Sequence, residues 1–560
     1  MKRAIPIEKG NEYTARIDSV SSEGNGVCRI DGYTVFVPQT VTGDKIRFRA
    51  VKLKSSFGSG ELIEIIEPSP YRNAPVCDAY ESCGGCQLMH IDYSHQLEIK
   101  RSIVENAMRR IGGAPDFCLE DIVGSEEVTR YRNKMIFHAA NGKNGVEFGF
   151  YAQRSHELAA ADDCIAGSSA NKEILDAVRR YMNKNNIKAY DEKTHKGLVK
   201  SVFTRVSHAN GSIMAVICAE NPQLPHTDEL VAELLSADEN IKSIILNVSG
   251  GTSQLLGRTN ITLYGSNTIS DTLCGIGFEI SPNSFFQINP KMTEKLYAKA
   301  IKYADLKGSE CVMDIYCGIG TISLCAAKKA DKVIGIEIVE EAIEDAKANA
   351  ERENIKNADF YAASAEDAVP ALIEKGVCPD VVILDPPRKG SDEKTLRAII
   401  RANPQKIVYV SCNPSTLARD TAFLSDFGYP PEKACAFDMF PNTTHVETVV
   451  LLSHKKPDGH INVKVEFGEG EGKVPLDNIA KRAESYKPKE RVTYKMIKEY
   501  IEAKYGFKVH TAYIAEVKRD LGLPMYDAPN AVEELKQPRK HPTAEKVEAI
   551  KDALKHFEVI

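Results

Sequence analysis

A strict alternation of apolar strands and helices is the feature that most constrains how this chain can fold. Between residues 305 and 453, the runs "ECVMDIY", "DKVIGIEI", "DVVILDPP", "KIVYVSC" and "VETVVLLS" are separated by helical stretches such as "VEEAIEDAKANAEREN" and "DEKTLRAIIRAN". This alternation predicts a doubly wound α/β sheet, in which ligands bind beyond the carboxyl ends of the strands. The ends of these strands are therefore the first places to search for a functional site.

The N-terminal part of the chain has a different period. Residues 8–66 alternate apolar and polar positions in short runs interrupted by glycine, which predicts a small antiparallel β-barrel of the OB type. Lys45, Arg47 and Arg49 occupy alternate positions of one such run, so they lie on one face of a strand. That pattern fits contact with RNA and fits a solvated strand face equally well.

The remaining segments complete a multidomain α/β organisation. Residues 95–113 have apolar positions at helical spacing and end in two glycines, and residues 119–275 mix strand-like and helical runs. Residues beyond 490 predict two short amphipathic helices around a glycine, with helix-turn-helix-like spacing. The expected domains are a barrel at 1–68, a central α+β region at 69–275, a catalytic domain at 276–456, a linker at 457–490 and a small C-terminal helical extension at 491–560.

Composition narrows the function classes. Hydrophobic residues make up 43% and charged residues 27% of the chain, no run has membrane-spanning length, and the two basic residues at the start precede no apolar stretch. We therefore expect a cytoplasmic protein that does not enter a membrane, with its 14 cysteines reduced and available for metal binding or catalysis. A net charge of −6 argues against a uniformly basic nucleic-acid binder but allows a local basic groove.

Three strand ends carry side chains suited to a cofactor. The first strand runs into "DIYCGIGTIS", where glycines let the backbone approach a ligand, and the second ends at Glu337, a carboxylate placed to accept hydrogen bonds from ribose hydroxyls. Because the glycines lack the full G-x-G-x-x-G pattern, S-adenosylmethionine is favoured over NAD. A later strand ends in "LDPPRKG", whose Asp385 would lie beside the cofactor; a rigid turn with a capping aspartate is the alternative reading.

Taken with "YVSCNPSTLARD", these motifs resemble those of the uracil-C5 RNA methyltransferase family. The matching pieces, in family order, are "SPNSFFQIN", "DIYCGIGTIS", "GIE", "LDPPRKG", "YVSCNPSTLARD" and "THVETVVLL", and the resemblance extends over about residues 8–453. It implies a methyltransferase that uses S-adenosylmethionine to form 5-methyluridine in RNA. It also implies that the N-terminal barrel is an RNA-binding TRAM domain.

The resemblance assigns roles to six residues. Carbon 5 of uracil is a poor nucleophile, and a thiolate that adds to carbon 6 activates it; Cys412 is implied to be that thiol. Glu447 is implied to be the base that removes the carbon 5 proton before the thiolate leaves. Gln287, Tyr316, Glu337 and Asp385 are implied to form the wall of the cofactor and active site. For the aromatic pair Phe285 and Phe286, contact with a base and core packing both remain open.

Four other cysteines form a second pattern. Cys77, Cys83 and Cys86 follow C-x5-C-x2-C spacing, and Cys164 is a fourth thiol far downstream. Four thiolates can hold zinc or an iron–sulfur cluster. The spacing resembles the [4Fe-4S] pattern of one subset of the family, with a structural or RNA-folding role, while zinc and unligated thiols remain the alternatives.

The barrel together with the four cysteines most resembles the branch that acts on 23S ribosomal RNA. We therefore expect 23S ribosomal RNA as the substrate and a monomeric enzyme, with transfer RNA as the alternative substrate. Arg130, Arg132 and Lys134 alternate along an expected strand that could contact phosphates. A cytosine-C5 methyltransferase is disfavoured because "LDPPRKG" lacks a cysteine, and a non-catalytic RNA-binding protein would not need Cys412 and Glu447.

Overall fold

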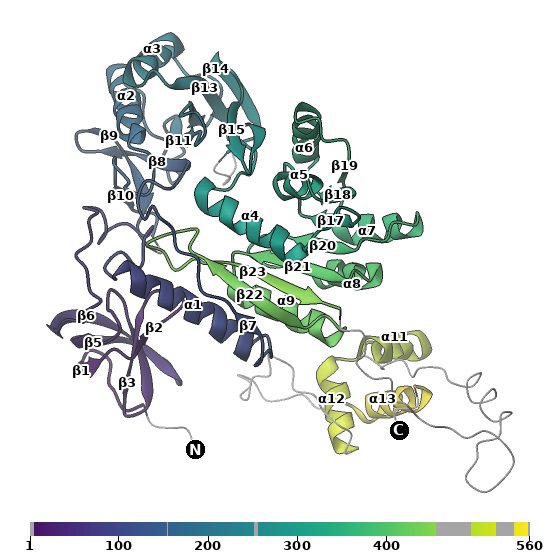
Figure 1. The fold of residues 1–560 in the computed structure, drawn as a ribbon. Helices are drawn as coiled ribbons and strands as arrows, with labels where there is room; N and C mark the ends of the chain where they lie inside the picture. The colour runs from purple at the N-terminus through teal and green to yellow at the C-terminus, as the bar shows by residue number, and fades with distance from the viewer. Residues whose placement is uncertain (1–4, 154, 251–255, 455–493, 522–541, 558–560) are drawn as a thin grey trace, which may run out of the picture. The chain divides into compact units, whose positions relative to one another are not determined.

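The structure, a computed structural model, describes residues 5–153, 155–250, 256–454, 494–521 and 542–557 (Figure 1). The chain divides into two compact units, Met1–Asp458 and Gly459–Ile560. The linker predicted at 457–490 lies outside the described residues. No helix in the described ranges is long and apolar enough to cross a membrane.

The first unit begins with a closed β-barrel, as predicted. Its strand order is β1-β5-β6-β4-β3-β2. The two strands at the ends of this order, β1 and β2, are separated in sequence only by Ile17 and Asp18, so the sheet closes on itself. Val35, Ile46 and Phe48 fill the interior and are fully buried. The strands are β1 (Glu12–Arg16), β2 (Ser19–Val20), β3 (Gly26–Ile30), β4 (Tyr33–Val37), β5 (Lys45–Leu53) and β6 (Phe57–Glu67).

The basic row on β5 is paired with acidic side chains. Strand register places carboxylates of β1 and β6 beside it, so the positive charge of the row is locally compensated. All of these side chains are at least 40% exposed, and such pairs contribute little to stability. The pairs are Lys45–Glu67, Arg47–Glu64 and Arg49–Glu12, with N–O distances of 2.7, 2.7 and 3.1 Å.

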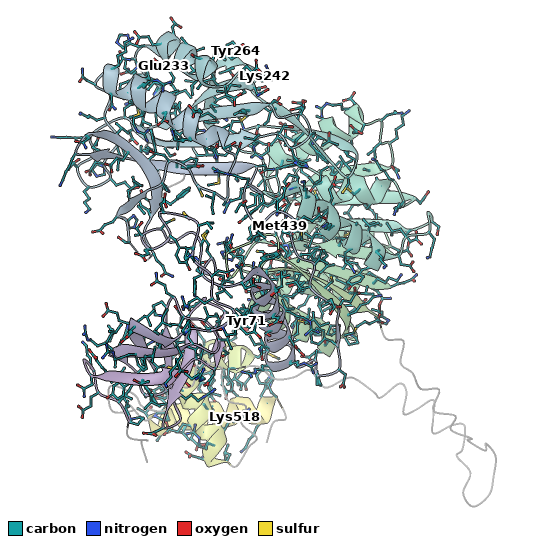
Figure 2. All side chains as sticks on the ribbon, turned by 60° about the vertical axis from the view of Figure 1, so that its left-hand side comes forward. Tyr71, Glu233, Lys242, Tyr264, Met439 and Lys518 are labelled. Atoms are coloured by element: carbon teal, nitrogen blue, oxygen red, sulfur yellow. The ribbon has the colours of Figure 1, made fainter. Side chains whose placement is uncertain are left out.

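A seven-stranded sheet forms the part of the unit that lies in the middle of the sequence, with two helices packed on one face and a hairpin on the other (Figure 1). In Figure 2, Glu233 marks the helical side and Tyr264 marks the edge strand. Arg180 and Glu233 join the two helices at 2.9 Å. The order is β10 (Leu158–Ala160), β9 (Gly145–Tyr151), β8 (Lys134–Gly142), β11 (Val199–Val206), β12 (Ile213–Ala219), β13 (Ile241–Val248) and β14 (Thr259–Gly265), with helices α2 (Ala170–Lys184) and α3 (Thr227–Ala237) and hairpin β15 (Ile269–Leu273) and β16 (Ile276–Ile280).

An eight-stranded sheet confirms the predicted doubly wound architecture. Its first five strands are parallel, and β23 then runs antiparallel between β21 and β22. The order is β19 (Ala358–Ala362), β18 (Lys332–Glu337), β17 (Cys311–Ile315), β20 (Val381–Leu384), β21 (Lys406–Ser411), β23 (Glu447–Ser453), β22 (Pro431–Phe437) and β7 (Cys118–Leu119).

Helices cover both faces of this sheet, which explains why its strands read as continuous apolar runs. In β20, for example, Val381 and Ile383 belong to one core, and Val382 and Leu384 belong to the other. The first core receives α4 (Pro290–Ala304), α5 (Thr321–Ala327) and α6 (Glu340–Arg352); the second receives α1 (Tyr93–Arg110), α7 (Ala365–Glu374), α8 (Glu393–Ala402) and α9 (Pro414–Asp426).

The second helical layer contains a segment from far upstream. Helix α1, predicted from its helical spacing, packs against α9, and β7 adds to the sheet edge by pairing with β22. Residues 93–119 therefore complete the eight-stranded sheet and its second helical layer, although the sequence analysis expected them in the central region at 69–275. Tyr71, labelled in Figure 2, stacks on His95 of α1 with ring centroids 4.2 Å apart.

The second unit has its own small core. The predicted helices are present as α11 (Tyr494–Tyr505) and α12 (Thr511–Asp520), and a further helix, α13 (Ala544–His556), packs on both. Ile501, Ile514 and Ile550 are fully buried among them. Lys518, labelled in Figure 2, lies over the ring of Tyr494 at 5.5 Å.

Candidate active site

One cavity of about 750 Å³ opens at the carboxyl ends of the parallel strands, and all six residues assigned by the resemblance line it. Topology explains why they meet. Tyr316, Asp385 and Cys412 each follow the last residue of a parallel strand, and Glu337 ends another. Strand β23 runs antiparallel to β21, with Thr448 opposite Ser411, so its first residue, Glu447, lies at the same edge.

The glycine turn and Glu337 form one end of the cavity. Gly318 and Gly320 have φ values of 54° and 83°, a backbone conformation that glycine adopts without strain. Gly318 N–H donates to Glu337 Oε2 at 3.3 Å, while Glu337 Oε1 accepts from the N–H groups of Ile338 and Val339 at 2.9 and 3.1 Å. The carboxylate is held in place, and Ile338, 70% exposed, offers an apolar surface beside it.

Burial dominates the electrostatics at the other end. Burial, followed by the charges of Glu447 and Asp385, raises the pKa of Cys412 to about 11, and burial, followed by the Asp385 charge, raises that of Glu447 to about 8. Burial also raises the pKa of Asp385 to about 7. Arg388 acts in the opposite direction, lowering the pKa values of Cys412 and Glu447. A cationic group in this cavity would therefore favour ionisation of all three acids.

The loop after β20 is fastened to the start of α9. Asn413 caps α9 by accepting from Ser415 N–H at 3.0 Å, and its Nδ2 donates to the Arg388 carbonyl at 3.1 Å. Gly390 has a φ of 76°, and a Cβ there would lie 2.5 Å from Asp420 Oδ2. The turn after Cys412 thus fixes the position of Arg388, which the sequence marked only as the residue following "DPP".

Of the two adjacent aromatic residues, Phe285 faces the cavity and Phe286 packs in the core. Phe285 lines the cavity with 62% of its surface exposed, whereas Phe286 is buried and packs against Phe278 with centroids 5.9 Å apart. Gln287 is 7% exposed, and its carbonyl accepts from Asn133 Nδ2 at 3.0 Å. The residue just before β8 therefore supports the segment that carries Phe285 and Gln287.

Of the three basic residues Arg130, Arg132 and Lys134, only the last two line the cavity. Arg132 and Lys134 line the cavity, and burial, followed by the charges of Arg205 and Arg132, lowers the Lys134 pKa to about 8. Arg130 has a φ of 56° and pairs with Asp163 at 2.6 Å. Strand β8 begins only at Lys134, so the expected strand over residues 130–134 is wrong for Arg130 and Arg132, although Arg132 still lines the cavity with Lys134.

The four patterned cysteines meet at a second cavity of about 270 Å³. Burial, followed by the charges of Cys164, Cys83 and Cys77, raises the pKa of Cys86 to about 12, so ionised thiols here need a positive centre. In the described part of the chain, no group of three or more His, Cys, Asp or Glu side chains has an arrangement that could hold a metal ion. The structure therefore brings the four thiols to one cavity without showing a formed metal site among the described residues.

Phe440 and His445 also line the first cavity, although no motif of the sequence indicates a specific role for either. His445 lies within "THVETVVLL", so the motif contained a signal, but its histidine was not singled out. Phe440 lies before that motif, in a loop without a recognisable pattern.

Comparisons with known proteins agree with this geometry. The family model described as tRNA (Uracil-5-)-methyltransferase matches residues 268–455, and the TRAM domain model matches residues 6–63. Proteins described as uncharacterized RNA methyltransferases from Clostridium tetani and Clostridium acetobutylicum are 43% and 42% identical, each over 81% of this chain and 99% of the relative. The crystal structure of Pyrococcus abyssi tRNA (uracil-54, C5)-methyltransferase in complex with S-adenosyl-L-homocysteine has a TM-score of 0.64 and 26% identity, and covers 79% of this chain and 100% of that one. The chain therefore belongs to the uracil-C5 RNA methyltransferase family, and it is an RNA methyltransferase with a TRAM domain.

Proposed function

We propose that the chain methylates carbon 5 of a uridine in RNA through a covalent bond between Cys412 and carbon 6 of the base. The observation that carries this proposal is a single cavity in which a half-buried thiol and a buried carboxylate, Glu447, lie next to a cofactor end formed by Gly318 and Glu337. A thiol and a second, proton-accepting group are what the two halves of this chemistry require.

Each residue has a defined task. Cys412 loses its proton to a cavity carboxylate, and its sulfur bonds to carbon 6 while the electron pair of the ring double bond moves to the carbon 4 oxygen. S-adenosylmethionine, when bound, supplies the methyl group that carbon 5 then takes. Glu447 removes the carbon 5 proton, the ring double bond re-forms, and the Cys412 sulfur leaves as a thiolate.

The rest of the cavity suits an extruded nucleotide. A uridine inside a helix could not reach Cys412, so the target is single-stranded or flipped out. Phe285 presents an exposed ring for stacking, the Gln287 amide matches the polar edge of uracil, and Arg132 and Lys134 provide cations for phosphate.

We further infer that a [4Fe-4S] cluster occupies the second cavity, held by Cys77, Cys83, Cys86 and Cys164. The chemistry above needs no redox step, so the cluster would stabilise the fold around it. The barrel and the cysteine set favour 23S ribosomal RNA as the substrate of a monomeric enzyme. Transfer RNA is the second candidate, because the Pyrococcus abyssi enzyme is named for position 54 of transfer RNA.

The test uses RNA fragments that contain 5-fluorouridine, in which fluorine replaces the carbon 5 hydrogen, so that Glu447 has no proton to remove and the methylated adduct persists. Wild-type protein should form an adduct that survives denaturing electrophoresis, and Cys412→Ala should form none while its affinity for S-adenosylhomocysteine is unchanged. Cys435→Ala is the matched control, since burial raises that thiol's pKa to about 11 as well, yet it lies outside the cavity. An adduct on Cys412→Ala would refute the mechanism. Offering ribosomal and transfer RNA separately, with mass spectrometry of the product, decides the substrate.

A further inference from the structure

The loop at residues 438–446 connects β22 to β23 and so leads directly into Glu447. It carries Phe440 and His445 into the active-site cavity. The loop is braced internally, because Thr443 Oγ1 donates to the Phe440 carbonyl at 2.8 Å and accepts from His445 N–H at 3.2 Å. A displacement at one point of this turn would therefore be passed on to the residues that face the substrate.

Asn442, in the middle of this loop, uses all of its polar groups. Its φ is 67°, a conformation that asparagine tolerates better than most residues. Its N–H and Oδ1 form a reciprocal pair with the Gln96 amide, at 3.0 and 3.1 Å, and its Nδ2 donates to the Val128 carbonyl at 2.9 Å. Its carbonyl accepts from Gln87 and Leu88 N–H at 3.0 and 2.9 Å. Every partner lies more than 300 residues upstream.

These contacts reach the cysteine cavity. Gln87 and Leu88 directly follow Cys86 in sequence, so the segment that holds Asn442 also carries one of the proposed cluster ligands. Thr443 lines the cysteine cavity, as does Tyr131, whose hydroxyl donates to the Pro441 carbonyl at 3.1 Å. The 438–446 loop thus has one side on each cavity.

A buried ion pair fixes the beginning of the same loop. Lys100 of α1 pairs with Asp438, both side chains being fully buried, and also donates to the Phe440 carbonyl at 3.0 Å. Because removing one partner of such a pair is costly, this end of the loop is rigid. Asn442 supports the other half, between Phe440 and Glu447.

We propose that Asn442 is a positioning residue for proton removal, which holds the loop before Glu447 and ties it to the cysteine-bearing segment 77–88. This inference rests on the proposed roles of Cys412 and Glu447. Loss of Asn442 should therefore slow removal of the carbon 5 proton by Glu447. It should leave cofactor binding at Gly318 and Glu337, at the opposite end of the cavity, unchanged.

The test is Asn442→Gly in the full-length protein. Glycine retains the positive φ and the backbone bonds but removes the side-chain bonds to Gln96 and Val128. With unmodified uridine RNA, we expect the methylated adduct to accumulate and its release to slow by about tenfold or more, as small misplacements of a reacting group allow. Affinity for S-adenosylhomocysteine should stay within about twofold. The control is Asn403→Gly, at an exposed position with a φ of 51° at the end of α8.

Further variants separate the possible outcomes. Gln96→Met should reproduce the slow release, and so should Cys86→Ser, with iron content and thermal unfolding measured alongside. Release at the wild-type rate in Asn442→Gly and Gln96→Met would refute the positioning role, as would an equal loss of adduct formation, release and cofactor binding, which indicates only damage to the fold. Wild-type release in Cys86→Ser would refute the tie to the cysteine segment. If Glu447→Gln turned over freely, the assignment of Glu447 as the base would be refuted, and this outcome is distinct from failure of the role proposed for Asn442.

Discussion

Glu447 is the residue that we propose as the base for the late step, removal of the carbon 5 proton. Burial, followed by the charge of Asp385, raises the pKa of Glu447 to about 8, which suits a base that works near neutral pH. Glu447→Gln keeps the shape of the side chain but cannot accept a proton, so methylated RNA should remain bonded to Cys412. Denaturing electrophoresis and mass spectrometry of the band would show this species. Multiple turnover by the variant would remove Glu447 from the role of base.

The raised pKa of Glu447 also sets a pH dependence. Below about pH 8 the Glu447 carboxyl is mostly protonated and cannot accept the carbon 5 proton, whereas above that pH the carboxylate is available. The rate of adduct release should therefore rise about tenfold per pH unit up to about pH 8 and then level off. Rapid-quench measurements on a preformed adduct isolate this step from the ionisation of Cys412. A release rate independent of pH between 6 and 8 would contradict the assignment.

At the level of single residues, sequence reasoning located the strand-end side chains and missed those held by distant partners. Asp385 and Cys412 could be expected in one cavity, because the topology of a doubly wound sheet brings strand ends together. Asn442 could not be found this way, since its partners Gln87, Gln96 and Val128 become neighbours only through packing. Which of Phe285 and Phe286 faces the cavity likewise depends on the local turn.

Among the secondary-structure elements, the parallel strands and α1 were predictable from their period, whereas short or register-dependent features were not. Strand β7 has two residues and carries no detectable pattern, so its place at the sheet edge comes from packing alone. The row of Lys45, Arg47 and Arg49 was visible in the sequence, but its pairing with glutamates depends on the registers of β1, β5 and β6. Helix α13 was not expected.

The proposed cluster at the cysteine-bearing segment can be tested by its colour and iron content. Protein purified without oxygen should be brown and contain about four irons per chain, because four thiolates typically hold a [4Fe-4S] cluster. Cys83→Ser should bleach the colour and lower the thermal stability of the first unit, since a lost ligand opens the site. Exposed Cys378 provides a control exchange outside the cavity, and Cys378→Ser should keep the colour. Colourless protein containing stoichiometric zinc would contradict the cluster.

At the scale of the whole molecule, the two units have separate hydrophobic cores. Ile501, Ile514 and Ile550 pack within the second unit's core, and the residues that we propose as catalytic belong to the first unit. The match to the family model ends at residue 455, so the second unit lies beyond it. Removing it should leave cofactor binding and the chemistry at Cys412 intact.

Truncation after residue 456 tests what the second unit contributes. Its lysines and arginines modestly outnumber its acids, and Lys504 and Lys508 are in exposed ion pairs that phosphate could displace. We expect the truncated protein to bind S-adenosylhomocysteine normally but to bind RNA more weakly, with a shallower dependence of affinity on salt, because fewer phosphates are neutralised. Fluorescence anisotropy with the same RNA fragment at several salt concentrations measures both quantities, and the double variant Lys504→Gln, Lys508→Gln in the full chain should shift them in the same direction. Unchanged affinity, salt slope and choice of uridine in the truncated protein would show that the second unit takes no part in RNA recognition.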